Sequence, residues 1–432
     1  MQRSIISILF TRFGSTVINF AIALLIARHA GPAIKGEVTL LVTTSWFFIF
    51  FSNILGGQAL VYLVPRNKTE LLVIPAYVWS FIIAILGFFF LQSTLLVHAK
   101  HIPAITVLSL LSSLITVHQT ILLARKRIGD SNLLQLVPLL LQLAGILYCF
   151  YFKHINDAYA YIYASSLAYS VTLVISFFMI IPHVKFGGFI RNFSFGELRD
   201  SFRYGILFQL VEIFQLLNLR YYFFQLGVQQ GSQYLGVYSI GISILEAVWN
   251  IPRSISTVHY VSTSNSTEIK QEVNRTLMLT KFGLVTSGVA LLLLWAVPSS
   301  VYTFVFGPGF HDVRHSVRYL FPGIWVYSLP IVISSFYLGT GNYKPLIISN
   351  LVGAVSVFVF SILLIPPYVM SGAGLAATLS FAIAAFILFL YFMMDNHIAL
   401  KQFLVSRNDI GFFIGYMRGW MKGMARRGEG RM

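Results

Sequence analysis

Long runs of apolar residues follow one another along almost the whole chain, separated by short polar connections. A membrane-spanning helix needs about 20 predominantly apolar residues, whereas the strands of a membrane barrel alternate over about ten. Runs long enough to span occur at 5–27, 38–64, 71–97, 103–124, 131–152, 158–181, 204–226, 233–256, 278–298, 316–339, 346–366 and 372–394. The pattern predicts an all-α polytopic membrane protein with about twelve transmembrane helices.

The composition supports this fold class and excludes several kinds of site. Hydrophobic residues make up 57% of the chain and charged residues 10%, against about 45–50% and about 25% in soluble domains. The single cysteine, Cys149, lies in an apolar run and excludes both a disulfide framework and a cysteine-based metal site. No histidine spacing suits a metal and no nucleotide-binding motif is present, so we expect no metal and no cofactor.

The formal net charge of +16 is explained by topology. If the N-terminus is cytoplasmic, 22 of the 30 Lys and Arg residues fall in cytoplasmic segments, among them Arg66, Arg127 and Arg253, and six fall on the other side. Both termini are therefore predicted to be cytoplasmic, in a multi-pass protein of the bacterial inner membrane. A basic balance that follows membrane orientation does not indicate a nucleic-acid partner.

The two halves of the chain resemble each other. Residues 121–137 align without gaps to 336–352 at an offset of 215, and both segments pair a helix end with a polar turn and a new helix. Such an offset predicts parallel repeats, with two six-helix bundles around a central cavity. We divide the chain into an N-terminal bundle (1–190), a C-terminal bundle (195–394) and a basic cytoplasmic tail (395–432).

Several stretches resemble the polysaccharide-transporter branch, the Wzx-type flippases, of the multidrug/oligosaccharidyl-lipid/polysaccharide exporter superfamily. These stretches are Ala27-Arg28-His29-Ala30-Gly31-Pro32 with Lys35-Gly36, Leu235-Gly236-Val237-Tyr238-Ser239 with Glu246 and Ile251-Pro252, Phe306-Gly307-Pro308-Gly309-Phe310, Tyr337-Leu338-Gly339-Thr340-Gly341, and Leu364-Ile365-Pro366 with Ser371-Gly372-Ala373-Gly374-Leu375-Ala376-Ala377-Thr378. Each motif is loose, and their order and spacing over residues 1–394 carry the resemblance.

The resemblance implies a transporter and not an enzyme. Such a flippase moves an undecaprenyl-pyrophosphate-linked oligosaccharide repeat unit from the cytoplasmic to the outer leaflet, by alternating access, for O-antigen and other surface polysaccharides. The implied partners are this substrate, membrane lipids, and the polysaccharide polymerase with its chain-length machinery.

Four ionisable residues lie within predicted spans, where a charge costs about 2.5–3.5 kcal/mol and tends to face a cavity or a partner. They are Arg12, Glu212, Arg220 and Glu246. We expect Arg12 and Arg220 to approach the cavity from opposite halves, because arginine binds phosphate oxygens with two parallel hydrogen bonds. Glu212 and Glu246 are candidates for proton coupling. The alternatives are that Arg12 extends to the membrane interface and that Arg220 and Glu246 form a fixed ion pair.

Two other function classes remain open at this point. A multidrug or cation antiporter of the same superfamily would prefer an apolar cavity with carboxylates. A membrane polysaccharide polymerase or glycosyltransferase typically carries a large outer loop, and the predicted outer connections here are short.

Overall fold

The structure is a computed structural model that describes residues 2–94, 96–184, 195–264, 266 and 268–403. Every regular element in these residues is helical. The first half of the chain forms α1 (Gln2–Gly56), α2 (Gln58–Leu63), α3 (Thr69–Gln92), η1 (Ala99–His101), α4 (Ile102–Ala124), α5 (Ile128–Tyr151), α6 (Ala158–Ile180) and η2 (Ile181–His183).

The second half repeats this succession of long helices. It forms α8 (Phe195–Gln230), α9 (Ser232–Ala247), α10 (Asn250–Ser264), α11 (Ile269–Ala296), α12 (Ser299–Phe306), η4 (Pro308–Phe310), α13 (Val313–Thr340), α14 (Lys344–Asp395) and η5 (Leu400–Phe403). The predicted basic tail lies outside the described residues from position 404 onward.

Within the described residues, eight helices are long and apolar enough to cross a membrane, or nine when α9 and α10, which bend by 45°, are taken as one span. Two of the eight candidates, Phe10–Val61 and Lys344–Asp395, are each 52 residues long. A helix of that length is about 78 Å, well over twice the thickness of a hydrocarbon core of about 30 Å. Both candidates contain a break, so their length does not correspond to one straight rod.

The breaks correct two sequence predictions. The connections predicted at 28–37 and 367–371 are present but much shorter, because the helical backbone is interrupted only near Gly31 (φ 78°) in α1 and Val369 (φ 50°) in α14. Gly31 lacks a Cβ and adopts this conformation readily. Each break divides its helix into two arms, and each arm corresponds to one of the two predicted spans on either side of the break.

Left-handed backbone positions recur at matching places in the two halves. Gly31 and Gly231 are 200 residues apart, whereas Lys126 and Gly341, and also His154 and Val369, are 215 apart. A positive φ is uncommon outside glycine, and three of the four residues in the two pairs at an offset of 215 are not glycine. The turn between α5 and α6 therefore corresponds to the break within α14, and the alignment at an offset of 215 has a counterpart in backbone geometry.

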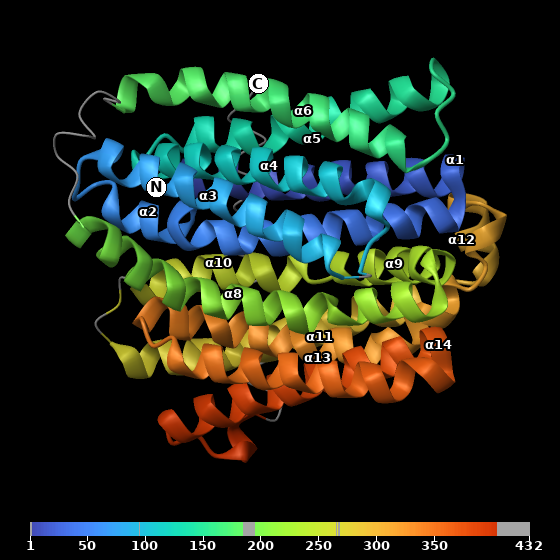
Figure 1. Cartoon of the computed structure of the whole chain (residues 1–432). Helices are drawn as coiled ribbons and strands as arrows, with labels where there is room; N and C mark the ends of the chain where they lie inside the picture. The colour runs from blue at the N-terminus through green and yellow to red at the C-terminus, as the bar shows by residue number, and fades with distance from the viewer. Residues whose placement is uncertain (1, 95, 185–194, 265, 267, 404–432) are drawn as a thin grey trace, which may run out of the picture.

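Hydrophobic clusters follow the same division. Figure 1 shows α1 to α6 as one layer, in blue to green, over α8 to α14 in green to red. Three buried clusters draw all their fully buried members from the first half, and two draw theirs only from the second. The largest cluster belongs to the second half but includes Ala27 and Leu40 of α1. The main connection between the layers is therefore α1.

Two glycines bring α1 and α9 into backbone contact. A Cβ on Gly36 would lie 1.8 Å from the carbonyl oxygen of Ser232, and a Cβ on Gly236 would lie 1.8 Å from that of Pro32. The contact is reciprocal, since each helix offers a carbonyl at one position and a glycine four residues later. Small residues allow helix backbones to approach closely in lipid, and no larger residue fits at either position without separating the helices.

This contact predicts opposite effects for similar glycine substitutions. Replacing Gly36 or Gly236 with Ala should lower the midpoint of thermal unfolding of the purified protein, because the added methyl group meets a backbone carbonyl. Gly129→Ala is the matched control, since a Cβ there meets nothing within 4 Å and alanine favours helix. Midpoints for Gly36→Ala and Gly236→Ala that equal or exceed that of Gly129→Ala would contradict the contact.

Candidate functional site

A cavity of about 670 Å³ lies between the two halves. Its walls come from α1 and α5 of the first half and from α8, α10, α13 and α14 of the second. More than half of its lining residues carry a hydroxyl or amide group, including Gln135 of α5, Tyr327 of α13 and Asn350 of α14. A space of this size and polarity suits a hydrophilic ligand, and its volume falls in the usual range of about 300–1,000 Å³ for ligand sites.

Three helices line the cavity with the same residue spacing. The positions i, i+3, i+4 and i+7 form one face of an α-helix. The stripes are Arg12, Ser15, Thr16 and Asn19 on α1; Phe208, Val211, Glu212 and Gln215 on α8; and Asn250, Arg253, Ser254 and Thr257 on α10. In α1 and α10 every member of the stripe is polar, although the helices lie in an otherwise apolar chain.

The cavity contains two guanidinium groups and one carboxylate. Arg12 Nη1 donates a hydrogen bond to Thr257 Oγ1 at 3.0 Å, which joins the first arm of α1 to α10 across the cavity. Arg253 lies one turn before Thr257, with its guanidinium carbon 5.5 Å from the centroid of the Trp249 ring. Arg253 also interacts electrostatically with both Arg12 and Glu212. The cavity therefore carries an excess of positive charge.

The structure does not bring the four predicted residues together. Arg12 and Glu212 line the cavity, whereas Arg220 and Glu246 are not among its lining residues. Arg253, which we assigned to membrane orientation, does line it. The expectation that Arg12 and Arg220 face a shared cavity is therefore not met, and the second cavity arginine comes from α10.

Arg220 and Glu246 instead form an ion pair between α8 and α9. Nη1 and Nη2 of Arg220 donate to Oε1 and Oε2 of Glu246, each at 2.7 Å, and the two side chains are 13% and 17% exposed. The guanidinium also lies 5.9 Å from the Trp46 ring of α1. Each charge satisfies the other, so neither requires contact with the aqueous cavity.

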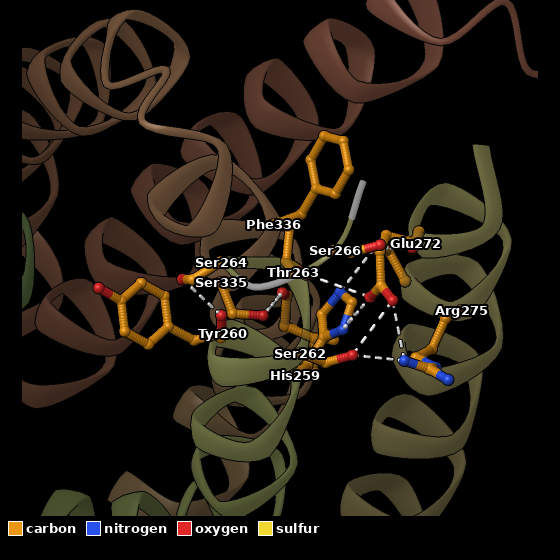
Figure 2. A network of polar contacts seen from close by, with 12 residues as sticks. His259, Tyr260, Ser262, Thr263, Ser264, Ser266, Glu272, Arg275, Ser335 and Phe336 are labelled. Carbon is orange, nitrogen blue, oxygen red and sulfur yellow. Dashed lines mark hydrogen bonds and ion pairs between the residues drawn. The ribbon is translucent and has the colours of Figure 1, made fainter. Parts of the chain in front are cut away.

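A second polar network anchors the opposite face of α10 (Figure 2). Glu272 of α11 is almost fully buried and accepts hydrogen bonds from Ser262 at 3.1 Å, Thr263 at 3.3 Å and Arg275 at 2.9 Å. His259 Nε2 lies 2.7 Å from Thr276 Oγ1, and its other ring nitrogen faces Glu272 at 3.4 Å. The network fixes α10 against α11 and so holds Arg253 and Thr257 towards the cavity.

In the part of the chain that the structure describes, no group of His, Cys, Asp or Glu side chains could hold a metal ion.

No protein-family model and no curated protein sequence matches the chain. Solved structures do match it. An inward-facing multidrug resistance MATE family transporter of the MOP superfamily has 13% identity, covers 89% of this chain and 94% of its own, and gives a TM-score of 0.70. The lipid II flippase MurJ, in an inward closed conformation, has 16% identity, covers 95% of this chain and 92% of its own, and gives a TM-score of 0.68.

The chain has the fold of the MOP superfamily transporters. A third match, a MOP superfamily transporter from Pyrococcus furiosus described as having a binding pocket of reversed polarity, has 13% identity, covers 91% of this chain and 95% of its own, and gives a TM-score of 0.64. The matches extend over nearly the full length on both sides, so the whole described helical arrangement shares this fold. Multidrug transporters and a lipid flippase both have this fold.

The Arg220–Glu246 pair predicts a characteristic double-mutant result. Arg220→Met or Glu246→Met alone should reduce membrane abundance and thermal stability, because removing one partner of a buried pair costs about 3–5 kcal/mol. The double Met variant should recover most of the loss, since no unpaired charge remains. Single variants that match the wild type, or a double variant that is worse than both, would contradict a fixed ion pair.

Proposed function

We propose that this protein is a flippase. It moves an undecaprenyl-pyrophosphate-linked oligosaccharide repeat unit from the cytoplasmic to the outer leaflet for surface polysaccharide biosynthesis. The motif resemblance to Wzx-type flippases supports this substrate, and the fold shared with a solved lipid II flippase supports the transport of a lipid-linked sugar.

The observation that carries the proposal is the chemistry of the cavity. Arg12 from one half and Arg253 from the other contribute two cations against the single carboxylate of Glu212. A pyrophosphate needs cationic donors once it leaves water, and arginine supplies two parallel hydrogen bonds to phosphate oxygens. The surrounding hydroxyl and amide groups suit the sugar hydroxyls that follow the pyrophosphate.

The proposed architecture has twelve spans in two groups of six, with both termini cytoplasmic. The arms of α1 on either side of Gly31 and those of α14 on either side of Val369 cross separately, and α8 crosses as well. The paired left-handed positions in the two halves support this count. In this arrangement the lipid tail stays in the bilayer while the head crosses inside the protein, in a cavity that opens alternately to each side.

The second candidate is a multidrug or cation antiporter, because a multidrug transporter shares the fold. Glu212 supplies the carboxylate that such a transporter would use. The two arginines oppose this function, since an organic cation entering the cavity would meet two like charges and one opposite charge. An efflux assay with cationic dyes separates the candidates, because the flippase should confer no dye export.

The cavity arginines should be essential for transport. Arg12→Ala and Arg253→Ala should each abolish translocation of a labelled undecaprenyl-pyrophosphate oligosaccharide in proteoliposomes, measured by its accessibility to an external lectin. Arg12→Lys and Arg253→Lys should restore only part of the rate, because lysine keeps the charge and lacks the planar fork.

The matched control is Arg127→Ala, which removes a guanidinium that pairs with Asp130 outside the cavity. Its rate should remain close to that of the wild type. Wild-type rates for both Arg12→Ala and Arg253→Ala, at equal protein incorporation, would rule out the cationic cavity.

Coupling to protons is predicted to depend on Glu212. Burial disfavours the charged form of a carboxylate, so a cavity glutamate can take up a proton during the cycle. Glu212→Gln should remove the acceleration that an imposed pH gradient gives to the wild type, while leaving the rate without a gradient measurable. Glu268→Gln, at an exposed turn, should respond as the wild type does. An unchanged response in Glu212→Gln would assign coupling to another residue or to none.

A further inference from the structure

A second hollow lies outside the central cavity, where the start of α8 meets the first half of the chain. It has a volume of about 470 Å³ and is lined by Leu55, Trp79, Leu198, Arg199, Phe202 and Arg203. We call it the α3–α8 groove. None of these residues lines the central cavity, so the groove is a separate feature.

The surface of the groove is apolar, and two arginines of α8 contribute to its lining. Arg199 and Arg203 are four residues apart in the first turns of α8, so they share one helix face, and both are exposed. Asp200 is a neighbour of Arg203 at a spacing of three residues, but it does not line the groove. Both guanidinium groups are therefore at the exposed rim of the groove, where an anion can reach them.

The apolar wall is built around Trp79 of α3, ten residues after the start of that helix. Its ring meets Phe202 edge to face at a centroid distance of 5.8 Å, and its indole nitrogen donates to the Phe51 carbonyl at 2.9 Å. Trp79 is thus fixed in place with its ring against the groove.

The location of the groove separates it from the general lipid-facing surface. Directly beyond it, a Cβ on Gly205 of α8 would lie 1.8 Å from the carbonyl oxygen of Ile54 in α1. Leu198 packs against a buried cluster of the first half. The groove therefore ends at a tight contact between the two halves and is not an open stretch of one helix.

We propose that the α3–α8 groove binds one anionic phospholipid. The two guanidinium groups bind its phosphate, and one acyl chain lies along Leu55, Phe202 and Trp79. Arginine pairs with phosphate oxygens through parallel hydrogen bonds, and two exposed arginines over an apolar wall match the shape and charge of such a lipid. The site is independent of the transported substrate.

The test uses quenching of tryptophan fluorescence by brominated acyl chains. The full-length protein is placed in nanodiscs of fixed phosphatidylcholine and phosphatidylglycerol content, with bromine on the chains of one lipid or the other. The signal of Trp79 is taken as the difference between the wild type and Trp79→Phe. Brominated phosphatidylglycerol should quench Trp79 more strongly than brominated phosphatidylcholine at the same mole fraction.

Two double variants decide the assignment. Arg199→Gln/Arg203→Gln should lose the preference for phosphatidylglycerol while unfolding at the wild-type temperature. Lys270→Gln/Lys344→Gln removes two exposed cations elsewhere and should keep it. Equal quenching by both lipids in the wild type, persistence of the preference in the arginine variant, or its loss in the lysine variant would overturn the proposal.

A competition experiment distinguishes the phospholipid from the transported lipid. Unlabelled undecaprenyl pyrophosphate should relieve the quenching no better than unlabelled phosphatidylglycerol does. Relief at a much lower mole fraction would show that the groove holds the tail of the substrate, and the phospholipid site would then be wrong.

Discussion

The backbone contact between α1 and α9 is the constraint on which the arrangement of the two halves depends. In lipid there is no hydrophobic force that drives one apolar helix onto another, so association rests on close packing and on internal hydrogen bonds. Gly36 and Gly236 each lie against a carbonyl of the opposite helix. Further along α1, Trp46 faces Arg220 and Ile54 meets Gly205. The second arm of α1 thus follows the second half from end to end.

The cost of a charge in hydrocarbon explains where the ionisable residues lie. Arg220 and Glu246 neutralise each other, and Glu272 is surrounded by hydroxyl and guanidinium donors. Arg12, Arg253 and Glu212 lie at the polar cavity. The paired charges hold helices together, and the cavity charges are the ones that the proposed substrate would meet.

The sequence was sufficient for an all-α membrane fold and for two of the three charged residues of the cavity, and the reasons are specific. The length of the apolar runs predicted transmembrane helices, because a helix needs about 20 apolar residues to cross the hydrocarbon core. It could not distinguish a loop at 28–37 from a break at Gly31, since a single glycine can turn the chain. Arg12 and Glu212 were found because they interrupt apolar runs. Arg253 was missed because it lies near the end of its predicted span (233–256) and was counted among the cytoplasmic cations, although the polar positions of Asn250, Arg253 and Thr257 fit one helix face.

Arg220 illustrates the opposite limit. Its place in an apolar run indicated that Arg220 faces either a cavity or a charged partner, and the run does not distinguish between them. The structure shows the partner, because Arg220 donates two hydrogen bonds of 2.7 Å to Glu246. The residues that share a helix face with each arginine would have distinguished Arg12, at the cavity, from Arg220, in an ion pair. Arg12 has Ser15, Thr16 and Asn19 on its own face, whereas Arg220 has Leu216 and Leu217 one turn before it and Phe223 and Phe224 one turn after.

The two arms of α1 differ in how firmly they are held to the second half. The second arm is fixed by backbone contacts at Gly36 and Ile54, which leave no room for one helix to slide past the other. The first arm faces α10 across the cavity and is joined to it there by the hydrogen bond from Arg12 to Thr257. A hydrogen bond of this kind, with a charged donor, contributes about 1.5–3 kcal/mol. The same guanidinium therefore contacts α10 across the cavity and would contact the proposed substrate, with different N–H groups free to serve each.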